Sequence, residues 1–355
     1  MKAAVLEAFG SPLVVETLPD PRPGAGEVVV DVVAAPVPSY ADEVLSGARQ
    51  HPLLLPLATG VGAVGCVRAA GPDATRIGPG EWVFCDPTVR SRDDAVSPDV
   101  MLQGWIAPGE GAQRLQAHFR NGPFAERMLM PMENAVRLGD LDSADAGRWC
   151  TLGTFLVPYG GLLAADLRAG ETVLISGAIG LFGGGGVAVA LAMGAGRVVA
   201  PGRNGAVLED LARRFGPRVA IVELSGDEGE DRERMSRAAQ GPVDEVLDIL
   251  PPLPDAAPVR AAAMTVRPHG TVVLMGGLRV GLELPYSHLM RNCVTVRGQY
   301  MYPRDAPARL VALVRSGLLS LDSFEVTGFG LDRANEAVAH AAAEGGPFRL
   351  TVVQP

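Results

Sequence analysis

Cysteine and histidine are both scarce in this sequence. Its 355 residues include four cysteines and five histidines. The cysteines lie far apart and form no CxxC pair, at positions Cys66, Cys85, Cys150 and Cys293. No histidine lies within four residues of a cysteine or of another histidine. This spacing argues against a disulfide framework and against a metal site, so we predict reduced, mostly buried thiols and no bound metal.

Long apolar runs and an excess of basic residues are also absent. No apolar run free of charge reaches the roughly 18–20 residues that a membrane helix needs. The start, MKAAVLEAFG, lacks the apolar core and cleavage site of a signal peptide. The formal net charge of −9 disfavours nucleic acid or an anionic membrane surface as the main partner. We therefore predict a cytoplasmic protein with no nucleic-acid partner and no membrane partner.

Apolar residues are plentiful, at 48% of the chain, and their pattern divides the sequence. The first 85 residues contain short β-branched runs bounded by Gly and Pro, such as GEVVVDVVAAPV, which predict a mostly antiparallel unit. From about residue 152, strand-like and helix-like segments alternate (ETVLISG, VAVALAMGA, RVVAPGR, AVLEDLARRFG), which predicts a parallel, doubly wound sheet. The end of the sequence, FRLTVVQP, again has the β-branched pattern of the first part and predicts a strand. Residues 88–122 are predicted to be a long functional loop around Trp105.

Six of the ten residues in GAIGLFGGGG, residues 177–186, are glycine. The run follows the strand-like TVLIS and precedes a predicted helix. A Gly-rich turn in that context lets the backbone approach a pyrophosphate at the helix N-terminus. Dinucleotide binding is predicted for Ala178, Gly180, Leu181, Phe182 and Gly183, which form the pattern A-x-G-x-x-G. The three glycines that follow are alternatively only a loose loop, or permit close packing.

The end of the next predicted strand indicates which dinucleotide is bound. A carboxylate there would hydrogen-bond the ribose of NAD, whereas an arginine accommodates a 2′-phosphate. The sequence reads VVAPGRN, with Gly202 in the place of the acid, followed by Arg203 and Asn204. We therefore predict NADPH as the cofactor. The alternative is that Arg203 is simply a solvated loop cation.

Several ordered motifs then resemble the medium-chain dehydrogenase/reductase superfamily over nearly the whole length. They include MKAAVLEAFG, GEVVVDVVAA, GPFAERMLMP, GETVLISGAIGLFG and the closing FRLTVVQP. The resemblance implies an α/β fold with a GroES-like, mostly-β catalytic domain built from residues 1–154 and 299–355. It implies a Rossmann doubly wound parallel-sheet domain at residues 155–298. It also implies a homodimer formed through the edge strand of the Rossmann sheet, near VVLMGG and LELPYSHL.

The resemblance is to the zinc-free branch of quinone oxidoreductases and enoyl reductases. The positions that hold the catalytic zinc in alcohol dehydrogenases of this superfamily fall here on Pro38, Val61, Gly62 and the vicinity of Gly153. None of these residues is a zinc ligand. The stretch around Trp105 takes the place of the lobe that normally holds a structural zinc.

The missing zinc favours an activated substrate. Hydride added to an α,β-unsaturated carbonyl leaves an enolate, which needs a hydrogen-bond donor at oxygen, whereas a saturated ketone needs stronger polarisation. We therefore predict NADPH-dependent reduction of a small hydrophobic α,β-unsaturated carbonyl compound or a quinone. The alternatives are a zinc-free carbonyl reductase or alcohol dehydrogenase, and a binding protein that keeps NADPH but has lost turnover.

The resemblance also assigns the site residues. Tyr40 aligns with the Ser or Thr that relays a proton in the zinc enzymes, which predicts a catalytic hydroxyl. The alternative is that the Tyr40 hydroxyl only forms a hydrogen bond with the backbone. Asp42 either orients Tyr40 or caps a helix. The substrate pocket is predicted to contain Tyr40, His51, Trp105 and Tyr300. The resemblance assigns further cofactor contacts to Thr154, Leu250, Gly276, Gly277 and Arg349.

Overall fold

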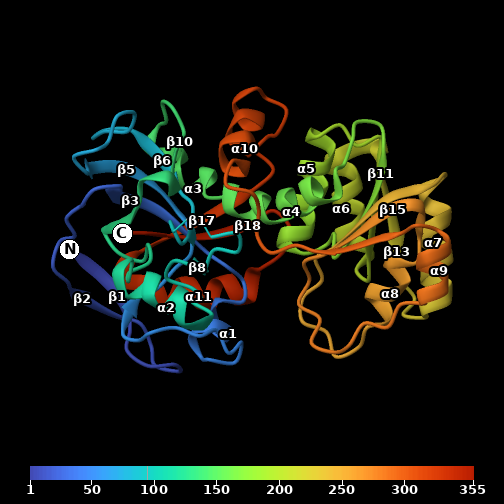
Figure 1. Cartoon of the computed structure of the whole chain (residues 1–355), viewed down its shortest axis with the longest axis horizontal. Helices are drawn as coiled ribbons and strands as arrows, with labels where there is room; N and C mark the ends of the chain where they lie inside the picture. Colours follow the sequence, from blue (N-terminus) through green and yellow to red (C-terminus); the bar gives the residue numbers. More distant parts are fainter. Residues whose placement is uncertain (94) are drawn as a thin grey trace. The chain divides into compact units, whose positions relative to one another are not determined.

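The computed structural model describes residues 1–93 and 95–355, and the chain divides into two compact units (Figure 1). The first unit comprises residues 1–153, 324–345 and 349–355. The second comprises residues 154–323 and 346–348. The predicted α/β fold class is confirmed, with one mostly-β unit and one Rossmann-like unit around a parallel sheet.

The first unit is built from short strands that both ends of the chain supply. Its largest sheet has the order β10-β6-β5-β3-β18-β17, with β9 also paired to β3, and a smaller sheet has the order β2-β1-β4. The strands are β1 (Lys2–Leu6), β2 (Val14–Thr17), β3 (Glu27–Val37), β4 (Leu57–Ala58), β5 (Ala63–Ala70), β6 (Trp82–Cys85), β7 (Thr88–Arg90), β8 (Val100–Leu102), β9 (Arg127–Pro131), β10 (Ala135–Arg137), β17 (Glu325–Gly330) and β18 (Arg349–Gln354). The helices are α1 (Ala41–Leu45), α2 (Gly109–His118), α3 (Ala146–Trp149) and α11 (Ala334–Glu344).

Pairing between distant segments closes this unit. Strand β18 lies between β3 and β17, with Val352 opposite Pro36 and Thr351 opposite Val37. Alternation of buried Val residues along β3 and β5 supplies one face of the core, which is why these β-branched runs form strands. The last residues of the chain thus complete a sheet that its first residues begin.

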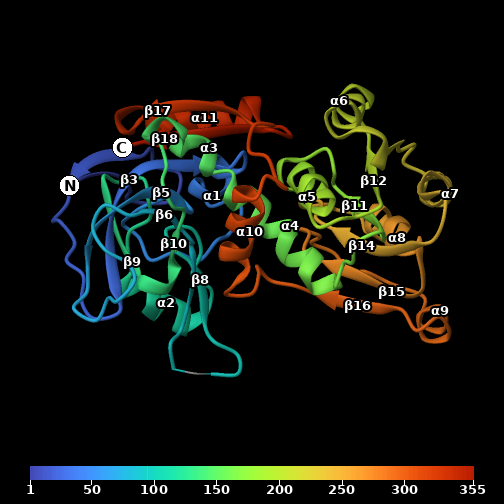
Figure 2. The same ribbon diagram turned by 90° about the horizontal axis from the view of Figure 1, so that it is seen from above.

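The prediction of one long loop over residues 88–122 was wrong. Strands β7 and β8 form a hairpin that projects from the first unit in Figure 2, and α2 follows it. Val89, Met101 and Phe119 belong to a small core of their own. Because these apolar residues are separated by polar and Gly-rich stretches, no local periodicity indicated that they pack together.

The second unit is a six-stranded parallel sheet of order β13-β12-β11-β14-β15-β16. Its strands are β11 (Thr172–Ser176), β12 (Arg197–Gly202), β13 (Val219–Glu223), β14 (Val243–Asp248), β15 (Val266–Leu274) and β16 (Thr295–Gly298). Its helices are α4 (Leu152–Ala165), α5 (Leu181–Ala192), α6 (Gly205–Phe215), α7 (Glu228–Ala239), α8 (Ala257–Ala263), α9 (Tyr286–Arg291) and α10 (Ala306–Arg315). The order reverses between β11 and β14, and ligands of open α/β sheets bind at such a switch point.

Residues 299–323 pack with the second unit, although the sequence grouped them with the first. A side chain at Gly160 of α4 would overlap the Met301 carbonyl oxygen and would crowd Tyr302. This close approach fixes the segment before α10 against α4. The guanidinium of Arg309 on α10 also lies 5.8 Å from the centre of the Tyr159 ring on α4.

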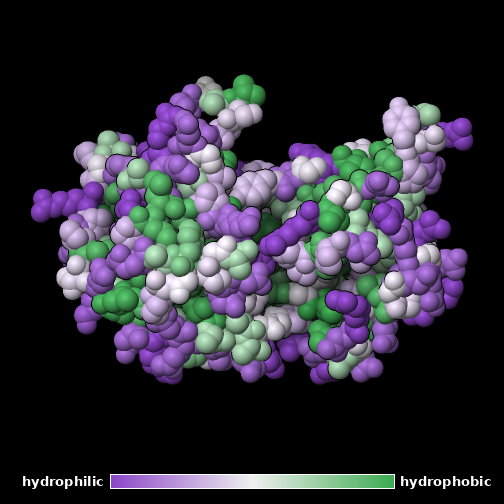
Figure 3. Space-filling view, turned by 90° about the horizontal axis from the view of Figure 1, so that it is seen from below, coloured by the Kyte–Doolittle hydropathy of each residue, from purple (hydrophilic) through white to green (hydrophobic). Residues whose placement is uncertain are grey.

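The surface of both units is mostly hydrophilic on the face drawn in Figure 3, with smaller hydrophobic patches between the polar groups. Within the described residues, no helix combines the length and the apolar character that crossing a bilayer requires.

Candidate functional site

The Gly-rich turn between β11 and α5 is shaped by contacts that exclude side chains. A Cβ on Gly183 would overlap the carbonyl oxygen of Gly177, and Gly177 itself has a φ of +96°. Gly180 precedes the helix and offers no side chain to cap it. The first-turn N–H groups of α5 are therefore left for an external anion, which the helix dipole also favours.

The other glycines of the run pack α5 against its neighbours rather than forming a loose loop. Residues 183–186 are all helical and buried. A Cβ on Gly185 would lie 3.3 Å from atoms of Thr154 and Phe155 on α4, and one on Gly186 would lie 3.1 Å from Pro158. The predicted residue Thr154 thus lies beside the helix that follows the turn, and Leu181 and Phe182 are half-buried in its first turn.

Two charged residues lie at the C-terminal end of β12. Arg203 follows this strand, and Glu223 comes from the neighbouring strand β13. Arg203 is exposed and makes no ion pair with another described residue. Asn204 caps α6 by accepting a hydrogen bond from the Val207 N–H at 3.2 Å. Parallel pairing places Glu223 of β13 beside Gly202, and a Cβ on Gly205 would lie 3.7 Å from its carboxylate. The sequence did not reveal Glu223, because its position depends on strand register.

The loops after β14 and β15 meet at the same edge of the sheet. The Gly277 N–H donates to the Leu250 carbonyl at 2.8 Å, and the Met275 N–H donates to the Asp248 carbonyl at 2.9 Å. The Ile249 N–H donates to the carbonyl of Ser176 in the adjacent strand at 3.0 Å. The structure thus brings together the predicted cofactor residues Leu250, Gly276 and Gly277, together with Asp248, which the sequence analysis missed.

Tyr40, His51 and Trp105 form a cluster in the first unit. The ring centres of Tyr40 and Trp105 are 6.0 Å apart, and those of His51 and Trp105 are 6.4 Å apart, both in edge-on geometry. The Arg49 guanidinium lies 4.0 Å from the centre of the Tyr40 ring. Trp105 is buried, and within the described part of the chain its Nε1 has no hydrogen-bond partner. Three of the four predicted pocket residues are therefore neighbours.

The environment of Tyr40 keeps it neutral. Burial raises the pKa of its phenol, and the positive charge of Arg49 and the side chain of Trp105 offset only part of that effect. A neutral phenol in partly apolar surroundings is a hydrogen-bond donor, which is the role that an enolate oxygen requires.

His51 and Asp42 differ in their relation to this cluster. The Nδ1 of His51 lies 3.3 Å from the Trp105 carbonyl oxygen, and burial lowers the pKa of the imidazole. Asp42 is exposed in the first turn of α1, where it does not contribute to the pKa of Tyr40. Glu43, one residue on, instead pairs with Arg49 at 2.9 Å.

Comparisons with known proteins agree with this fold and turn. Residues 179–316 match the family model described as zinc-binding dehydrogenase. An alcohol dehydrogenase from Rhizobium meliloti (strain 1021) is 28% identical over 308 residues, covering 86% of this chain and 85% of the relative. These matches show that the chain is similar to oxidoreductases of the dehydrogenase type.

Two further proteins are similar to this chain. Acryloyl-coenzyme A reductase from Metallosphaera sedula is 30% identical over 206 residues, or 56% of this chain and 58% of the relative. The structure of a proposed zinc-binding dehydrogenase from Sinorhizobium meliloti 1021, solved with NADP bound, is 23% identical with a TM-score of 0.81, covering 100% of this chain and 99% of that one. Because the relatives carry several names, the zinc-free branch stays a prediction.

The described residues of this chain do not offer a set of donor atoms that fits zinc. Within the part of the chain that the structure describes, no three His, Cys, Asp or Glu side chains cluster as metal ligands. Cys85 and Cys150 are fully buried, and burial raises the pKa of each thiol well above its usual value. The Cys150 Sγ donates to the Ala34 carbonyl oxygen at 3.3 Å. Since zinc binds thiolates, these buried thiols are poor ligands.

Two predicted residues belong to a different unit from the residues with which they were grouped. Tyr300 is exposed and belongs to the second unit, whereas Tyr40, His51 and Trp105 belong to the first. Arg349 is predicted to contact the pyrophosphate. It lies on β18 in the first unit, and its guanidinium pairs with the Glu344 carboxylate at 3.2 Å. The pattern of the sequence could not reveal this pairing, because it forms between a helix and a strand.

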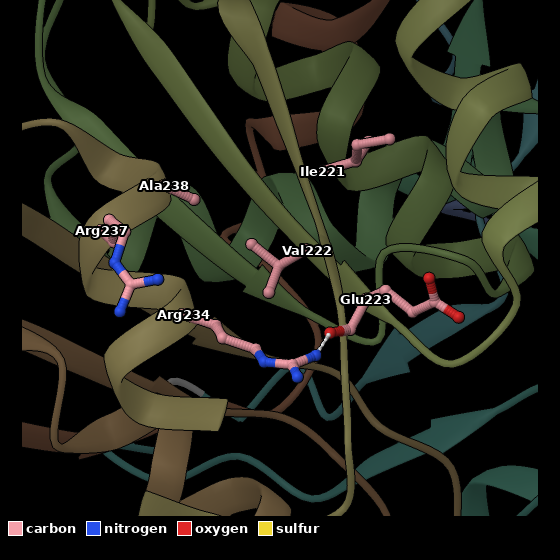
Figure 4. Close-up of a pocket in the computed structure, with 6 residues that line it drawn as sticks. All are labelled: Ile221, Val222, Glu223, Arg234, Arg237 and Ala238. Carbon is pink, nitrogen blue, oxygen red and sulfur yellow. Dashed lines mark hydrogen bonds between the residues drawn. The ribbon is translucent and has the colours of Figure 1, made fainter. Parts of the chain in front are cut away.

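A shallow groove of about 340 Å³ follows the outer edge of the parallel sheet (Figure 4). Ile221 and Val222 of β13 line one side of it, and Arg234 and Arg237 of α7 line the other. Arg234 is occupied, because it donates to the Glu223 carbonyl at 2.9 Å and pairs with Glu230 at 2.6 Å. Glu223 also lines the groove, and Figure 4 shows its carboxylate directed away from these arginines.

Proposed function

We propose that this chain is an NADPH-dependent oxidoreductase that reduces an activated substrate, an α,β-unsaturated carbonyl compound or a quinone, without a metal ion. The observation that carries the proposal is the Tyr40 cluster. A neutral phenol next to Trp105 and His51 occurs in a chain whose zinc positions hold Pro38, Val61, Gly62 and Gly153. Acryloyl-coenzyme A reductase acts, by its name, on such a conjugated carbonyl, which adds support.

The cofactor would be held by the turn before α5. The space kept free by Gly183 and the uncapped helix start suit a pyrophosphate, and Arg203 suits a 2′-phosphate. Bound NADPH would supply the hydride. Tyr40 would donate a hydrogen bond to the substrate oxygen as negative charge develops there. Trp105 is buried and would support Tyr40 from behind rather than contact the substrate.

The deciding test is NADPH oxidation with a chelator present, on an α,β-unsaturated ketone and its saturated counterpart. We expect turnover of the unsaturated ketone only. Tyr40→Phe, which keeps the ring and removes the hydroxyl, should then lower kcat about 100-fold while leaving NADPH binding within about twofold. Glu7→Gln is the control, because Glu7 is exposed after β1 and lies outside the predicted site, and it should retain turnover.

The second candidate is a metal-independent carbonyl reductase or alcohol dehydrogenase. The names of several relatives, including the enzyme from Rhizobium meliloti, favour it. In this case Tyr40 would polarise the carbonyl of a saturated aldehyde or ketone. Turnover of the saturated ketone in the presence of the chelator would establish this activity and overturn the first proposal.

The choice between NADPH and NADH is tested at the end of β12. Arg203→Gln should weaken NADPH binding about tenfold and change NADH binding little, because it removes one charge-assisted contact to the 2′-phosphate. Glu223→Gln should change the preference in the opposite direction, since its carboxylate lies beside Gly202 and Gly205. Equal effects of Arg203→Gln on both cofactors would argue against NADPH preference.

We also propose a homodimer formed through β16. This strand is an exposed edge of the parallel sheet, with Val296 partly exposed on it and Tyr286 and Met290 exposed on the preceding helix. A second copy that adds its own β16 would satisfy the edge and cover these side chains. Sedimentation equilibrium of the wild type and of Val296→Lys tests it, and a monomeric wild type would refute it.

A further inference from the structure

Asp248 is a buried carboxylic acid at the carboxyl end of β14, beside the switch point of the parallel sheet. Its side chain is only 3% exposed. Strand register places it between Ser176 at the end of β11 and Leu274 at the end of β15. Within residues 1–93 and 95–355, its Oδ1 has no hydrogen-bond partner. A buried carboxylate with an unsatisfied oxygen is costly, so its presence calls for a reason.

The carboxyl group lies beneath two loops that the structure joins to each other. A Cβ on Gly276 would overlap the Oδ2 of Asp248, and it would lie 3.1 Å from the Leu250 carbonyl oxygen. The Gly277 N–H donates to that same carbonyl at 2.8 Å. Asp248 thus occupies the space that a side chain at position 276 would need, directly below the junction of the loops that follow β14 and β15.

The charge of Asp248 is balanced by backbone groups alone. Burial raises the pKa of its carboxyl group to about 6, and the N–H groups of Leu250 and Gly276 hold it from rising further. Ser176 and Leu274, its partners on the flanking strands, carry no charge. The ionised form, which attracts both N–H groups, therefore prevails above about pH 6, and it is lost on acidification through that value.

We propose that Asp248 is a positioning residue that holds the Leu250 loop and the Gly276–Gly277 loop in the conformation that binds the nicotinamide half of the cofactor. The inference rests on the proposed function, which assigns these loops to the cofactor. The carboxyl group lies against Gly276 and below the junction of the two loops, and the N–H groups of Leu250 and Gly276 favour its ionised form. When it is protonated, or replaced by an amide, the negative charge that attracts both N–H groups is lost.

The test is the affinity for NADP⁺, measured by titration calorimetry between pH 5 and pH 8, which needs no turnover. Asp248→Asn should weaken binding about tenfold at pH 7.5, because it removes the negative charge that attracts the N–H groups of both loops. At pH 5 the wild type should itself have lost most of this advantage. The ratio of the two affinities is the decisive quantity, because it cancels the titration of the phosphate on the ligand.

The matched control is Glu245→Gln on the same strand. Glu245 is also a buried acid, and its pKa is also raised, but it lies three residues before Asp248 and away from both loops. This variant should bind NADP⁺ with the same pH dependence as the wild type. If the ratio of wild-type to Asp248→Asn affinity is constant from pH 5 to pH 8, Asp248 has only a structural role and the inference fails.

A second variant covers the case in which Asp248→Asn does not fold. Gly276→Ala keeps the carboxyl group but pushes a methyl group against Oδ2, so binding should weaken about fivefold or more. Gly241→Ala is its control, since a Cβ at Gly241 would meet no atom within 4 Å. Wild-type affinity in Gly276→Ala would overturn the inference. Absence of NADP⁺ and NAD⁺ binding in the wild type would instead overturn the proposed function.

Discussion

Glu245 should make the second unit less stable as the pH rises. It lies on β14 opposite Val173 and Thr271 of the neighbouring strands, and its side chain is only 7% exposed. Its Oε2 has no hydrogen-bond partner among the described residues. Burial, followed by the negative charges of Glu171 and Asp244, raises the pKa of Glu245 to about 8, and Arg267 offsets only part of this.

The sign of the effect follows from proton uptake. In the unfolded chain the Glu245 carboxyl loses its proton near its ordinary pKa of 4.5, whereas in the folded chain it keeps the proton up to about pH 8. Folding therefore takes up a proton between these values, and stability falls as the pH rises across that window. At pH 7 the full difference corresponds to about 3 kcal/mol. Because exposed neighbours such as Asp166 are screened by solvent, we expect about 2 kcal/mol.

Glu245→Gln removes the titration and keeps the shape. The variant and the wild type should have similar free energies of unfolding at pH 5, and the variant should be about 2 kcal/mol more stable at pH 8. Urea unfolding followed by far-UV circular dichroism at several pH values measures the difference. Glu209→Gln, an exposed site on α6, is the control and should change little at either pH.

The tryptophans provide an internal check. Trp82, Trp105 and Trp149 all lie in the first unit, so their fluorescence reports on the unit that does not contain Glu245. If the free energies of unfolding of the wild type and Glu245→Gln differ by the same amount at pH 5 and pH 8, the reasoning is refuted. Such a result would show an effect of packing alone, with no shift in the pKa of Glu245.

Two further predictions concern local contacts. Gly183→Ala should destabilise the second unit by about 1–3 kcal/mol because its methyl group would overlap the Gly177 carbonyl oxygen, whereas Gly180→Ala, with its nearest atom 3.4 Å away, should be nearly neutral in urea unfolding. Burial raises the pKa of Glu27, but hydrogen bonding to His118 and Gly24 outweighs this and brings the pKa below its usual value. The Glu27–His118 pair therefore stabilises the folded chain above about pH 4.5, and this stabilisation is lost as the pH falls. His118→Ala should lower the free energy of unfolding by about 1 kcal/mol at pH 6, measured by tryptophan fluorescence. His118→Gln, which can still donate a hydrogen bond to Glu27, should lower it much less. Equal losses in the two variants would contradict the role of that hydrogen bond.

The features that sequence predicted well are those that neighbouring residues determine. The turn before α5 depends on glycines three residues apart, because only that spacing leaves room for the Gly177 carbonyl beside Gly183. The alternation of strands and helices after residue 152 is local in the same way. The hairpin of β7 and β8 was missed because its core joins Val89, Met101 and Phe119, whose separation follows no helical or strand period.

The acids at the carboxyl end of the parallel sheet were missed for a different reason. Glu223 comes to the end of β12 because Gly202 and Glu223 are paired in register, and Asp248 comes beneath Gly276 because Asp248 is paired with Leu274. In each case the two residues are more than twenty positions apart. Reading only the end of the second strand therefore finds the cation Arg203 but not the carboxylate next to it.

These two acids would affect the proposed cofactor in different ways because they differ in exposure. Glu223 is exposed, so its carboxylate would act on the adenosine end of a dinucleotide directly, against the phosphate that Arg203 favours. Asp248 is buried and its charge depends on pH, so it acts through the two loops whose N–H groups it attracts. Substitution at Glu223 should accordingly alter the ratio of NADPH to NADH affinity at constant pH, and substitution at Asp248 should alter the pH dependence of both affinities without changing their ratio.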